Sequence, residues 1–206
     1  IGQGYTQTTP LQLCLMTAQL ANGGFKIKPK IVAEKNQETV ETIKNKMLDS
    51  LINKNTSSLF KTTEKLFNTS DDQYSKLFKN QKNIKFILDA MYGATNEMYG
   101  TSYKSRIEDK KYQFAGKTGT AQVKRITEAE RELDLKTSQI PYKDRDHALY
   151  VAYGPYENPR YAISIVVEHG GSGSVTAAPI AKELFKLVID RHELRENNRL
   201  KKFTKI

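Results

Sequence analysis

The middle of the sequence reads Gln113-Phe114-Ala115-Gly116-Lys117-Thr118-Gly119-Thr120-Ala121-Gln122-Val123. This stretch sets a lysine, a hydroxyl and a bare glycine in immediate succession, and its flanks favour extended structure. One interpretation is a strand whose edge and face bind a peptide carboxylate. The other is a strand entry or turn that happens to contain lysine and glycine. The tripeptide Lys-Thr-Gly does not decide between them, because so short a motif recurs by chance.

The composition favours a globular protein of one domain or slightly more. The chain has 206 residues, of which 38% are hydrophobic and 27% are charged, and this length suffices to bury a sizeable core. Its formal net charge is +10, so a basic nucleic-acid binder is one alternative. The lysines and arginines are spread along the whole chain, however, without aromatic-basic alternation or a helix-turn-helix signal. We therefore expect no nucleic-acid partner.

Cys14 is the one cysteine, and it lies in an apolar run. It cannot form an internal disulfide, so we expect a buried, inert thiol. The sequence has no apolar run of about 18 residues, the length that a membrane-spanning helix needs, and no signal peptide. It opens on Ile1-Gly2-Gln3-Gly4 without an initiating methionine, as though cut from a longer protein.

A buried helix is predicted near the amino end. Thr9 suits the N-cap, Pro10 suits the first helical position, and Gln12 completes a capping box. Residues 11–21 are apolar nearly all round, which is typical of a buried helix. Asn22-Gly23-Gly24 then predicts a left-handed C-cap.

The region that follows is largely polar. Residues 25–32 alternate apolar side chains with lysine around Pro29, which indicates a short edge strand. Residues 34–82 are rich in lysine, asparagine, threonine and serine, and we interpret them as a polar helical insertion with a structural role. Within it, residues 40–52 show helical spacing. A core-facing helix is expected from about residue 84 to residue 97.

Two strands are predicted after a charged loop over residues 124–146. Residues 147–153 and residues 160–168 have the composition of strands, and no crossover helix separates them. We therefore expect antiparallel pairing with the central stretch. The expected class is an α+β fold with an antiparallel sheet and packed helices.

The carboxyl end combines a glycine-rich segment with a helix. Residues 170–174 lack the spacing of a phosphate-binding loop, so we interpret them as a flexible connector. An apolar helix is predicted over residues 177–190. Residues 191–206 are interpreted as a fraying basic tail on the surface.

Groups that could bind a metal do not cluster in the sequence. His147, His169 and His192 lie far apart without metal-ligand spacing, so each is interpreted as a strand-end or surface histidine. Asp71-Asp72 lies in the polar insertion and is interpreted as solvated. We expect neither a metal nor a cofactor.

The chemistry that remains is carried by Lys117-Thr118-Gly119-Thr120. An ammonium and a hydroxyl on one strand can hold a carboxylate by charge-assisted hydrogen bonds. A glycine beside them lets a peptide lie against the strand as an added edge. The backbone amide of Thr120 could then serve as an oxyanion donor. Lys-Thr-Gly also forms a set with Ser-x-x-Lys and Ser-x-Asn in penicillin-binding proteins and β-lactamases.

Four blocks in the same order resemble class B penicillin-binding proteins. Residues 115–122 resemble the third motif of this family. Residues 2–13, with Gly-Gln-Gly and Thr-Pro-Leu-Gln-Leu, resemble the segment between its second and third motifs. Residues 147–159 resemble the strand and turn after the third motif. Residues 166–173 and then residues 177–181 resemble the last strand and the last helix. Within the family the sequence is most similar to penicillin-binding protein 2.

The resemblance implies the C-terminal part of a β-lactamase/transpeptidase-like fold. It also implies a serine-type D,D-transpeptidase that cross-links peptidoglycan during cell elongation. It assigns substrate binding to Lys117, Thr118, Gly119 and Thr120, with the Thr120 backbone as an oxyanion donor. In the family, the nucleophilic serine with its lysine and the Ser-x-Asn motif all precede the Gly-Gln-Gly segment. We therefore expect the nucleophile to lie outside residues 1–206, and we expect this chain alone to be inactive.

One segment mimics the nucleophile motif. Ser58-Leu59-Phe60-Lys61 fits Ser-x-x-Lys, but it follows the Thr-Pro-Leu-Gln block, and no Ser-x-Asn comes between it and Lys117. We interpret it as a chance match.

The resemblance further implies the partners and the location. The partners are peptidoglycan stem peptides, β-lactam antibiotics and cell-wall proteins of the elongation complex. The location is the periplasmic face of the inner membrane, through an anchor outside this chain.

Two rival functions on the same fold stay open. One is a β-lactamase or D,D-carboxypeptidase, which hydrolysis of nitrocefin would favour. The other is a non-catalytic penicillin-binding sensor module, which upstream sequence with a transmembrane signalling partner would favour.

Overall fold

The structure is a computed structural model. It describes residues 7–30, 76–78, 80–124, Glu132, Leu135 and 137–203, with side chains as far as residue 198.

The chain divides into two compact units. Residues 1–23 together with residues 80–206 form the first, and residues 24–79 form the second. The helix predicted at residues 40–52 and the Ser-x-x-Lys match at Ser58 lie outside the described residues.

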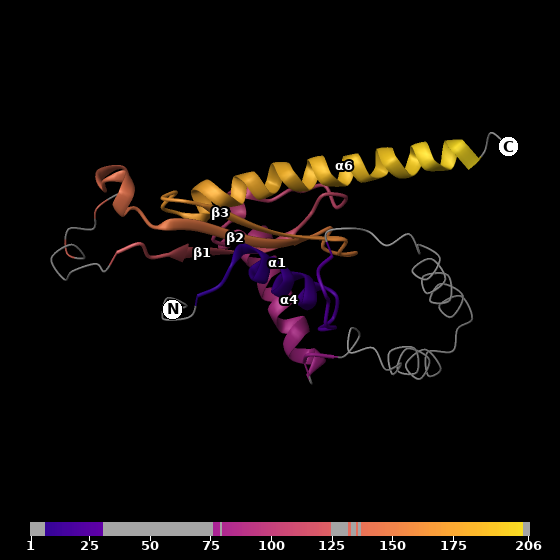
Figure 1. The fold of residues 1–206 in the computed structure, drawn as a ribbon, viewed down its shortest axis with the longest axis horizontal. Coiled ribbons are helices and arrows are strands. Elements are labelled where there is room, and N and C mark those ends of the chain that lie inside the picture. The colour runs from indigo at the N-terminus through magenta and orange to yellow at the C-terminus, as the bar shows by residue number, and fades with distance from the viewer. Residues whose placement is uncertain are drawn as a thin grey trace. The chain divides into compact units, whose positions relative to one another are not determined.

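The first unit is built on an antiparallel sheet in the order β1-β2-β3 (Figure 1). The strands are β1 (Ala115–Ala121), β2 (His147–Gly154) and β3 (Tyr161–Val167). Lys117 of β1 lies opposite Val151 of β2, which in turn lies opposite Ser164 of β3. The predicted strands and their antiparallel pairing are confirmed.

Helix α1 (Pro10–Ala21) begins with the predicted capping box. Thr9 N–H donates to Gln12 Oε1 at 2.8 Å, and Gln12 N–H donates to Thr9 Oγ1 at 3.2 Å. The helix ends before Gly23, whose φ of 88° lies in the region that favours glycine.

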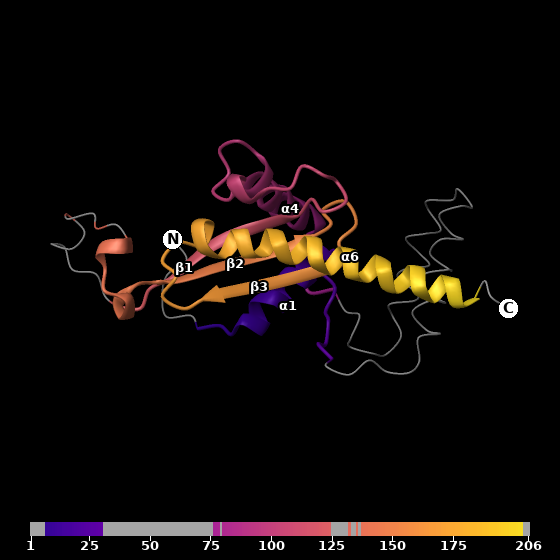
Figure 2. The same ribbon diagram turned by 90° about the horizontal axis from the view of Figure 1, so that it is seen from above.

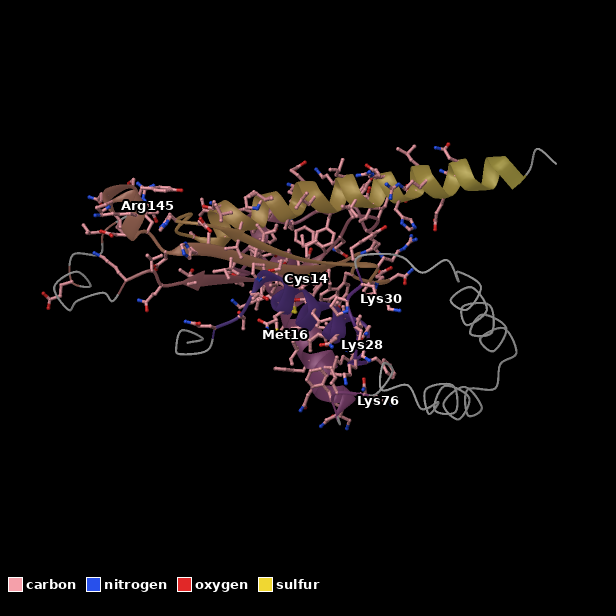
Figure 3. All side chains as sticks on the ribbon, in the orientation of Figure 1. Cys14, Met16, Lys28, Lys30, Lys76 and Arg145 are labelled. Carbon is pink, nitrogen blue, oxygen red and sulfur yellow. The ribbon has the colours of Figure 1, made fainter. Side chains whose placement is uncertain are left out.

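The prediction that this helix is buried all round is wrong. Only Thr17 and Leu20 are buried, whereas Leu11 is 61% exposed and Met16 is 44% exposed. The helix packs with one side against β3, on the face of the sheet away from α6, and Met16 lies on that helix (Figure 3). Its other side finds no partner of comparable extent among the described residues.

Helix α4 (Gln81–Asn96) is the core-facing helix expected near residues 84–97. Asn80 caps it by accepting a hydrogen bond from Lys82 N–H at 3.0 Å. The buried side chains of α4 are those of Ile84, Met91 and Thr95, and the helix packs against β1.

Helix α6 (Ala178–Phe203) runs over the opposite face of the sheet (Figure 2). Ala148, Tyr150 and Ala152 alternate toward this face, as the pleat of β2 requires. Phe185 of α6 stacks on Phe114 with ring centroids 4.9 Å apart. The core on this side is closed.

The helix predicted to end near Asp190 continues to Phe203, so the fraying tail is wrong over residues 191–203. Ion pairs support the added turns: Glu196 contacts His192 at 2.9 Å and Arg160 at 3.3 Å. Lys111 reaches Glu193 at 2.8 Å. Leucine, arginine, glutamate and lysine also have high helix propensity.

Four shorter helical turns complete the described part of the first unit. Three are 3₁₀ turns and one is a π-helical turn: Tyr103–Ser105, Thr137–Gln139, Tyr142–Asp144 and, as the π-helical turn, Gly173–Ala177. None of the helices in the described ranges combines the length and apolarity that spanning a membrane requires.

The second unit is described only at its two ends. Phe25 and Lys76 form an isolated antiparallel bridge, and Leu77 N–H donates to Gly24 O at 2.8 Å. Lys76, labelled in Figure 3, places its ammonium 5.8 Å from the Phe25 ring centroid. The predicted edge strand is wrong over residues 26–30, where the proline lacks the N–H that a ladder needs.

Candidate functional site

Strand β1 has a strand neighbour on one side only in the described part of the chain. On its other side, Gly116 N–H donates to Thr95 Oγ1 at 3.0 Å, and Asn96 Nδ2 donates to Phe114 O at 2.9 Å. In an antiparallel strand, alternate residues direct their peptide groups to the same edge. The peptide groups of Thr118 and Thr120 therefore face this same outer edge.

A lysine and two threonine side chains meet at this edge. The exposed Lys117 directs Nζ to Thr118 O at 2.9 Å and to Thr118 Oγ1 at 3.4 Å. Thr118 Oγ1 lies 3.3 Å from Thr101 Oγ1, in the turn after α4. The three groups together offer an ammonium and two hydroxyls, which is the donor set that a carboxylate requires.

Thr101 was not identified as a site residue from the sequence. Its hydroxyl is part of the cluster because Ser102, the next residue, is anchored to α4. Both Ser102 N–H and Ser102 Oγ donate to Ala94 O, at 3.0 and 2.9 Å. No spacing in the sequence signals this contact.

Gly119 lies beneath the glycine-rich segment. A Cβ on Gly173 would lie 2.4 Å from Leu149 O and 2.7 Å from Gly119 O. Only a glycine allows so close an approach of the two backbones. The segment predicted to be a flexible connector, residues 170–174, thus leads into the π-helical turn Gly173–Ala177, which packs on β1 and β2.

A buried group of hydroxyls lies behind the edge strand. Tyr150 OH is 2.9 Å from Thr95 Oγ1 and 3.0 Å from Ser102 Oγ. Burial raises the pKa of Tyr150, while the hydrogen bonds with Ser102 and Thr95 oppose that rise. The phenol is therefore neutral at physiological pH.

Two histidines predicted to be separate strand-end or surface residues lie together at the end of the sheet. His169 N–H donates to His147 Nδ1 at 2.9 Å, and the two ring centroids are 4.8 Å apart. His169 Nδ1 lies 3.0 Å from Arg145 O, and Arg145 is labelled in Figure 3. His147 is paired with Ala121 at the end of β1, so this cluster closes the end of the strand beyond Thr120.

Within the described ranges, the remaining candidate side chains do not form a second functional site. Cys14 is half-buried on α1, donates to Ala162 O at 3.3 Å, and has its pKa raised by burial. His192 pairs with Arg160 and Glu196. Among the described residues, no three histidine, cysteine, aspartate or glutamate side chains group in a way that could hold a metal ion.

An α+β fold with a Lys-Thr-Gly edge strand is characteristic of the serine acyltransferases that react with β-lactams. The family model of the penicillin binding protein transpeptidase domain matches residues 1–186. The chain belongs to this family.

The names of similar proteins support this family assignment. Peptidoglycan D,D-transpeptidase MrdA of Salmonella typhimurium is 31% identical over 190 residues, which are 92% of this chain and 26% of that protein. MrdA of Haemophilus influenzae is 28% identical over 191 residues, which are 93% of this chain and 25% of that protein. The chain thus spans about a quarter of the length of the curated relatives that it matches.

A solved structure gives the same result. The crystal structure of Pseudomonas aeruginosa PBP2 in complex with WCK 5153 matches with a TM-score of 0.57 and 28% identity. The match covers 91% of this chain and 32% of that one. The predicted α+β class and the resemblance to penicillin-binding protein 2 are confirmed.

Proposed function

We propose that this chain is the carboxylate-binding part of a peptidoglycan D,D-transpeptidase. The observation that carries the proposal is the cluster of Lys117 Nζ, Thr118 Oγ1 and Thr101 Oγ1 on the outer edge of β1. The relatives from Salmonella and Haemophilus bear the name peptidoglycan D,D-transpeptidase, which supports this reaction over the two rivals.

A stem peptide is bound as an added strand. Its backbone pairs with the outward-facing peptide groups of Thr118 and Thr120. Its terminal carboxylate receives hydrogen bonds from the Lys117 ammonium and the neighbouring hydroxyls. Gly119 leaves no side chain between the peptide and the strand.

The acyl transfer uses a serine that we place outside this chain. Its oxygen attacks the carbonyl carbon of the penultimate D-alanine, and Thr120 N–H stabilises the oxyanion together with the amide of the serine itself. The bond to the terminal D-alanine breaks, and the leaving amine takes up a proton. An amine of a second stem peptide then attacks the ester, forms the cross-link and releases the serine.

The wider assignments follow the same proposal. A β-lactam would occupy the site of the stem peptide, and cell-wall proteins of the elongation complex would be partners of the full-length protein. The protein would act at the periplasmic face of the inner membrane, held by an anchor outside residues 1–206. Residues 34–82 would be a polar helical insertion, and residues 191–206 would be a basic tail.

Mapping of a labelled penicillin tests this proposal. The full-length protein is treated with a fluorescent penicillin, digested, and examined by mass spectrometry for the modified peptide. We expect one label per protein, on a serine outside residues 1–206. Label on Ser58, or rapid continuous hydrolysis of nitrocefin, would contradict the proposal.

A further inference from the structure

The turn that carries Thr101 and the edge of β1 are joined through the interior of the protein. Tyr150 comes from the central strand, Thr95 from the last turn of α4, and Ser102 from the turn after α4. All three side chains are at most 2% exposed. They are too deep to contact a substrate, yet they connect the two backbone segments that carry the carboxylate-binding hydroxyls.

The hydrogen-bond directions follow from the number of available protons. Each hydroxyl has a single proton to donate. Ser102 Oγ donates its proton to Ala94 O at 2.9 Å, because this is its shortest contact and a carbonyl can only accept; Thr95 Oγ1 is farther away, at 3.4 Å. The 3.0 Å contact between Tyr150 OH and Ser102 Oγ therefore uses the proton of Tyr150.

Counting protons in the same way gives the directions of the hydrogen bonds that reach β1. Since the proton of Tyr150 is used in that bond, the 2.9 Å contact with Thr95 uses the proton of Thr95, which has only longer contacts with Met91 O at 3.3 Å and Gly116 O at 3.4 Å. Thr95 Oγ1 accepts in turn from Gly116 N–H at 3.0 Å. One directed chain thus runs from Gly116 N–H through Thr95, Tyr150 and Ser102 to Ala94 O, and it satisfies every hydroxyl proton.

We infer that Tyr150, Thr95 and Ser102 are positioning residues that set the distance between Thr101 and Thr118. Gly116 lies two residues before Thr118, and Ser102 directly follows Thr101, so the two ends of the chain flank the two hydroxyls. A fully satisfied buried network specifies one arrangement of the groups it joins. This inference rests on the proposed function, because it concerns the same carboxylate site.

The phenolic hydroxyl is the central link. Without it, Thr95 can donate instead to Met91 O at 3.3 Å or Gly116 O at 3.4 Å, and Ser102 Oγ loses its donor. The aromatic ring can stay in place, where it fills the space beside Gly116. A Cβ on Gly116 would lie 2.5 Å from Tyr150 OH and 2.6 Å from Tyr150 Cζ. Tyr150→Phe therefore removes the link and keeps the packing.

Strand β2 contains a second tyrosine, Tyr153, that serves as a matched control for Tyr150. It is also buried, at 1% exposure, and its hydroxyl also bonds to α4, at Leu88 O with a distance of 3.4 Å. It belongs to the cluster on the other face of the sheet, with Met91 and Ala115. Tyr153→Phe thus removes a comparable hydroxyl and leaves intact the hydrogen-bond chain from Gly116 N–H to Ala94 O.

The test compares two probes on the full-length protein. Acylation rates are measured with benzylpenicillin, which has a free carboxylate, and with its methyl ester, which has none. We expect Tyr150→Phe to lower the preference for the acid about 10-fold, since small misplacements of binding groups have effects of this order or larger. Tyr153→Phe should leave the preference unchanged. Thr95→Val should act like Tyr150→Phe, and Thr95→Ser should restore the wild-type preference.

The outcomes separate the inference from the proposed function. If Tyr150→Phe slows the acid and the ester equally, or changes neither rate, the hydroxyls have only a structural role and the inference is wrong. If the wild-type protein is not acylated by benzylpenicillin at all, the proposed function itself fails. If Tyr150→Phe does not fold, the comparison of Thr95→Ser with Thr95→Val decides the same question.

Discussion

The two faces of the β1-β2-β3 sheet differ in how completely helices of this chain cover them. On the α6 face, Phe114, Tyr150 and Phe185 are at most 1% exposed. On the α1–α4 face, Leu149 and Val151 of β2 are only half-buried, although both helices pack on the sheet. Helix α6 exposes Ile180, Leu187 and Leu194, and α1 and α4 likewise turn large apolar side chains to solvent. We call the exposed set on α1 and α4 the open surface; it consists of Leu11, Met16, Phe86 and Ile87.

This difference shows which face of the sheet the chain covers fully with its own residues. The α6 face obtains its covering helix from within the sequence, so its core is closed. The α1–α4 face has half-buried strand side chains beneath exposed apolar side chains of its helices, and apolar groups exposed in this way are typical of a surface that binds another protein segment. The chain spans about a quarter of the length of its named relatives, so the proposed serine-bearing part is the natural candidate to cover this surface.

The largest expected effect is the loss of stability when the closed face is opened. Phe185→Ala removes a ring that is 1% exposed and stacks on Phe114 at 4.9 Å. We expect the free energy of unfolding to fall by about 3–5 kcal/mol, as for other buried phenylalanines. Urea unfolding of the chain followed by circular dichroism measures this change.

Phe86→Ala is the matched control on the open surface, where the side chain is 74% exposed. Its effect should stay within about 0.5 kcal/mol, as for most surface substitutions. Equal losses for the two variants would show that the two faces are covered to the same extent.

The second-largest expected effect is a loss of activity with no loss of stability. Lys117 is exposed, so its removal should leave the melting temperature unchanged. Lys117→Ala in the full-length protein should lower the acylation rate by benzylpenicillin about 10- to 100-fold, which corresponds to one charge-assisted hydrogen bond. Stopped-flow measurement with a fluorescent penicillin checks this.

Lys110→Ala serves as the control for this variant. Its side chain is 80% exposed and only approaches Glu157, at 3.8 Å. An acylation rate that falls as much in Lys110→Ala as in Lys117→Ala would point to general loss of positive charge and not to a specific site.

A smaller effect is expected on association. The 206-residue chain should self-associate through the open surface, and Leu11→Glu with Phe86→Glu should shift it to the monomer. Leu187→Glu is the control, because Leu187 is equally exposed, at 62%, but lies on α6. Light scattering at several concentrations measures the mass. A strictly monomeric wild-type chain would count against the open surface as a binding face.

The smallest effect is a pH dependence on the closed side. Asp190 of α6 accepts hydrogen bonds from Tyr112 OH at 2.6 Å and Lys111 Nζ at 2.9 Å. Tyr112 and then Lys111 lower the pKa of Asp190 below its ordinary value of 3.8. A carboxylate with a lowered folded-state pKa stabilises the fold above its ordinary pKa, and this contribution disappears as the pH falls through the lowered value.

Asp190→Asn should therefore have a slightly lower melting temperature at neutral pH, and the difference should vanish in acid. Melting curves of both proteins between neutral pH and the acid limit test the sign. A difference that grows on acidification would contradict the assignment.

Much of the fold could be predicted because its signals are local. The capping box at Thr9 and Gln12 and the glycine stop at Gly23 are encoded within a few residues, and all three are observed. The strand-like composition of β2 and β3 is likewise visible in a short window. Antiparallel pairing followed from the absence of a crossover helix between them.

Two of the errors, the length of α6 and the burial of α1, have a common physical cause, since they depended on contacts remote in sequence. The length of α6 depends on ion pairs such as Arg160 with Glu196, which composition alone does not reveal. The burial of α1 depends on what packs on its outer side. Residues 26–30 were expected to pair as a strand, although only Phe25 forms a bridge.

Some residues of the candidate site could likewise be predicted from the sequence, and others could not. Lys117 and Thr118 were named from a motif, and they do lie together at the edge of β1. Thr101 could not be named, because its role depends on a turn that folds back on the strand 17 residues later. The hydroxyl chain through Tyr150 was also out of reach, since it joins three segments that no spacing relates.

The proposed carboxylate site on β1 is tested most directly by a structure of the full-length protein acylated by benzylpenicillin. We expect the carboxylate of the bound drug to lie within hydrogen-bond distance of Thr118 Oγ1, with Lys117 Nζ and Thr101 Oγ1 adjacent, and the acyl oxygen to face Thr120 N–H. A carboxylate held by other residues, with β1 unoccupied, would contradict the proposed role of this strand.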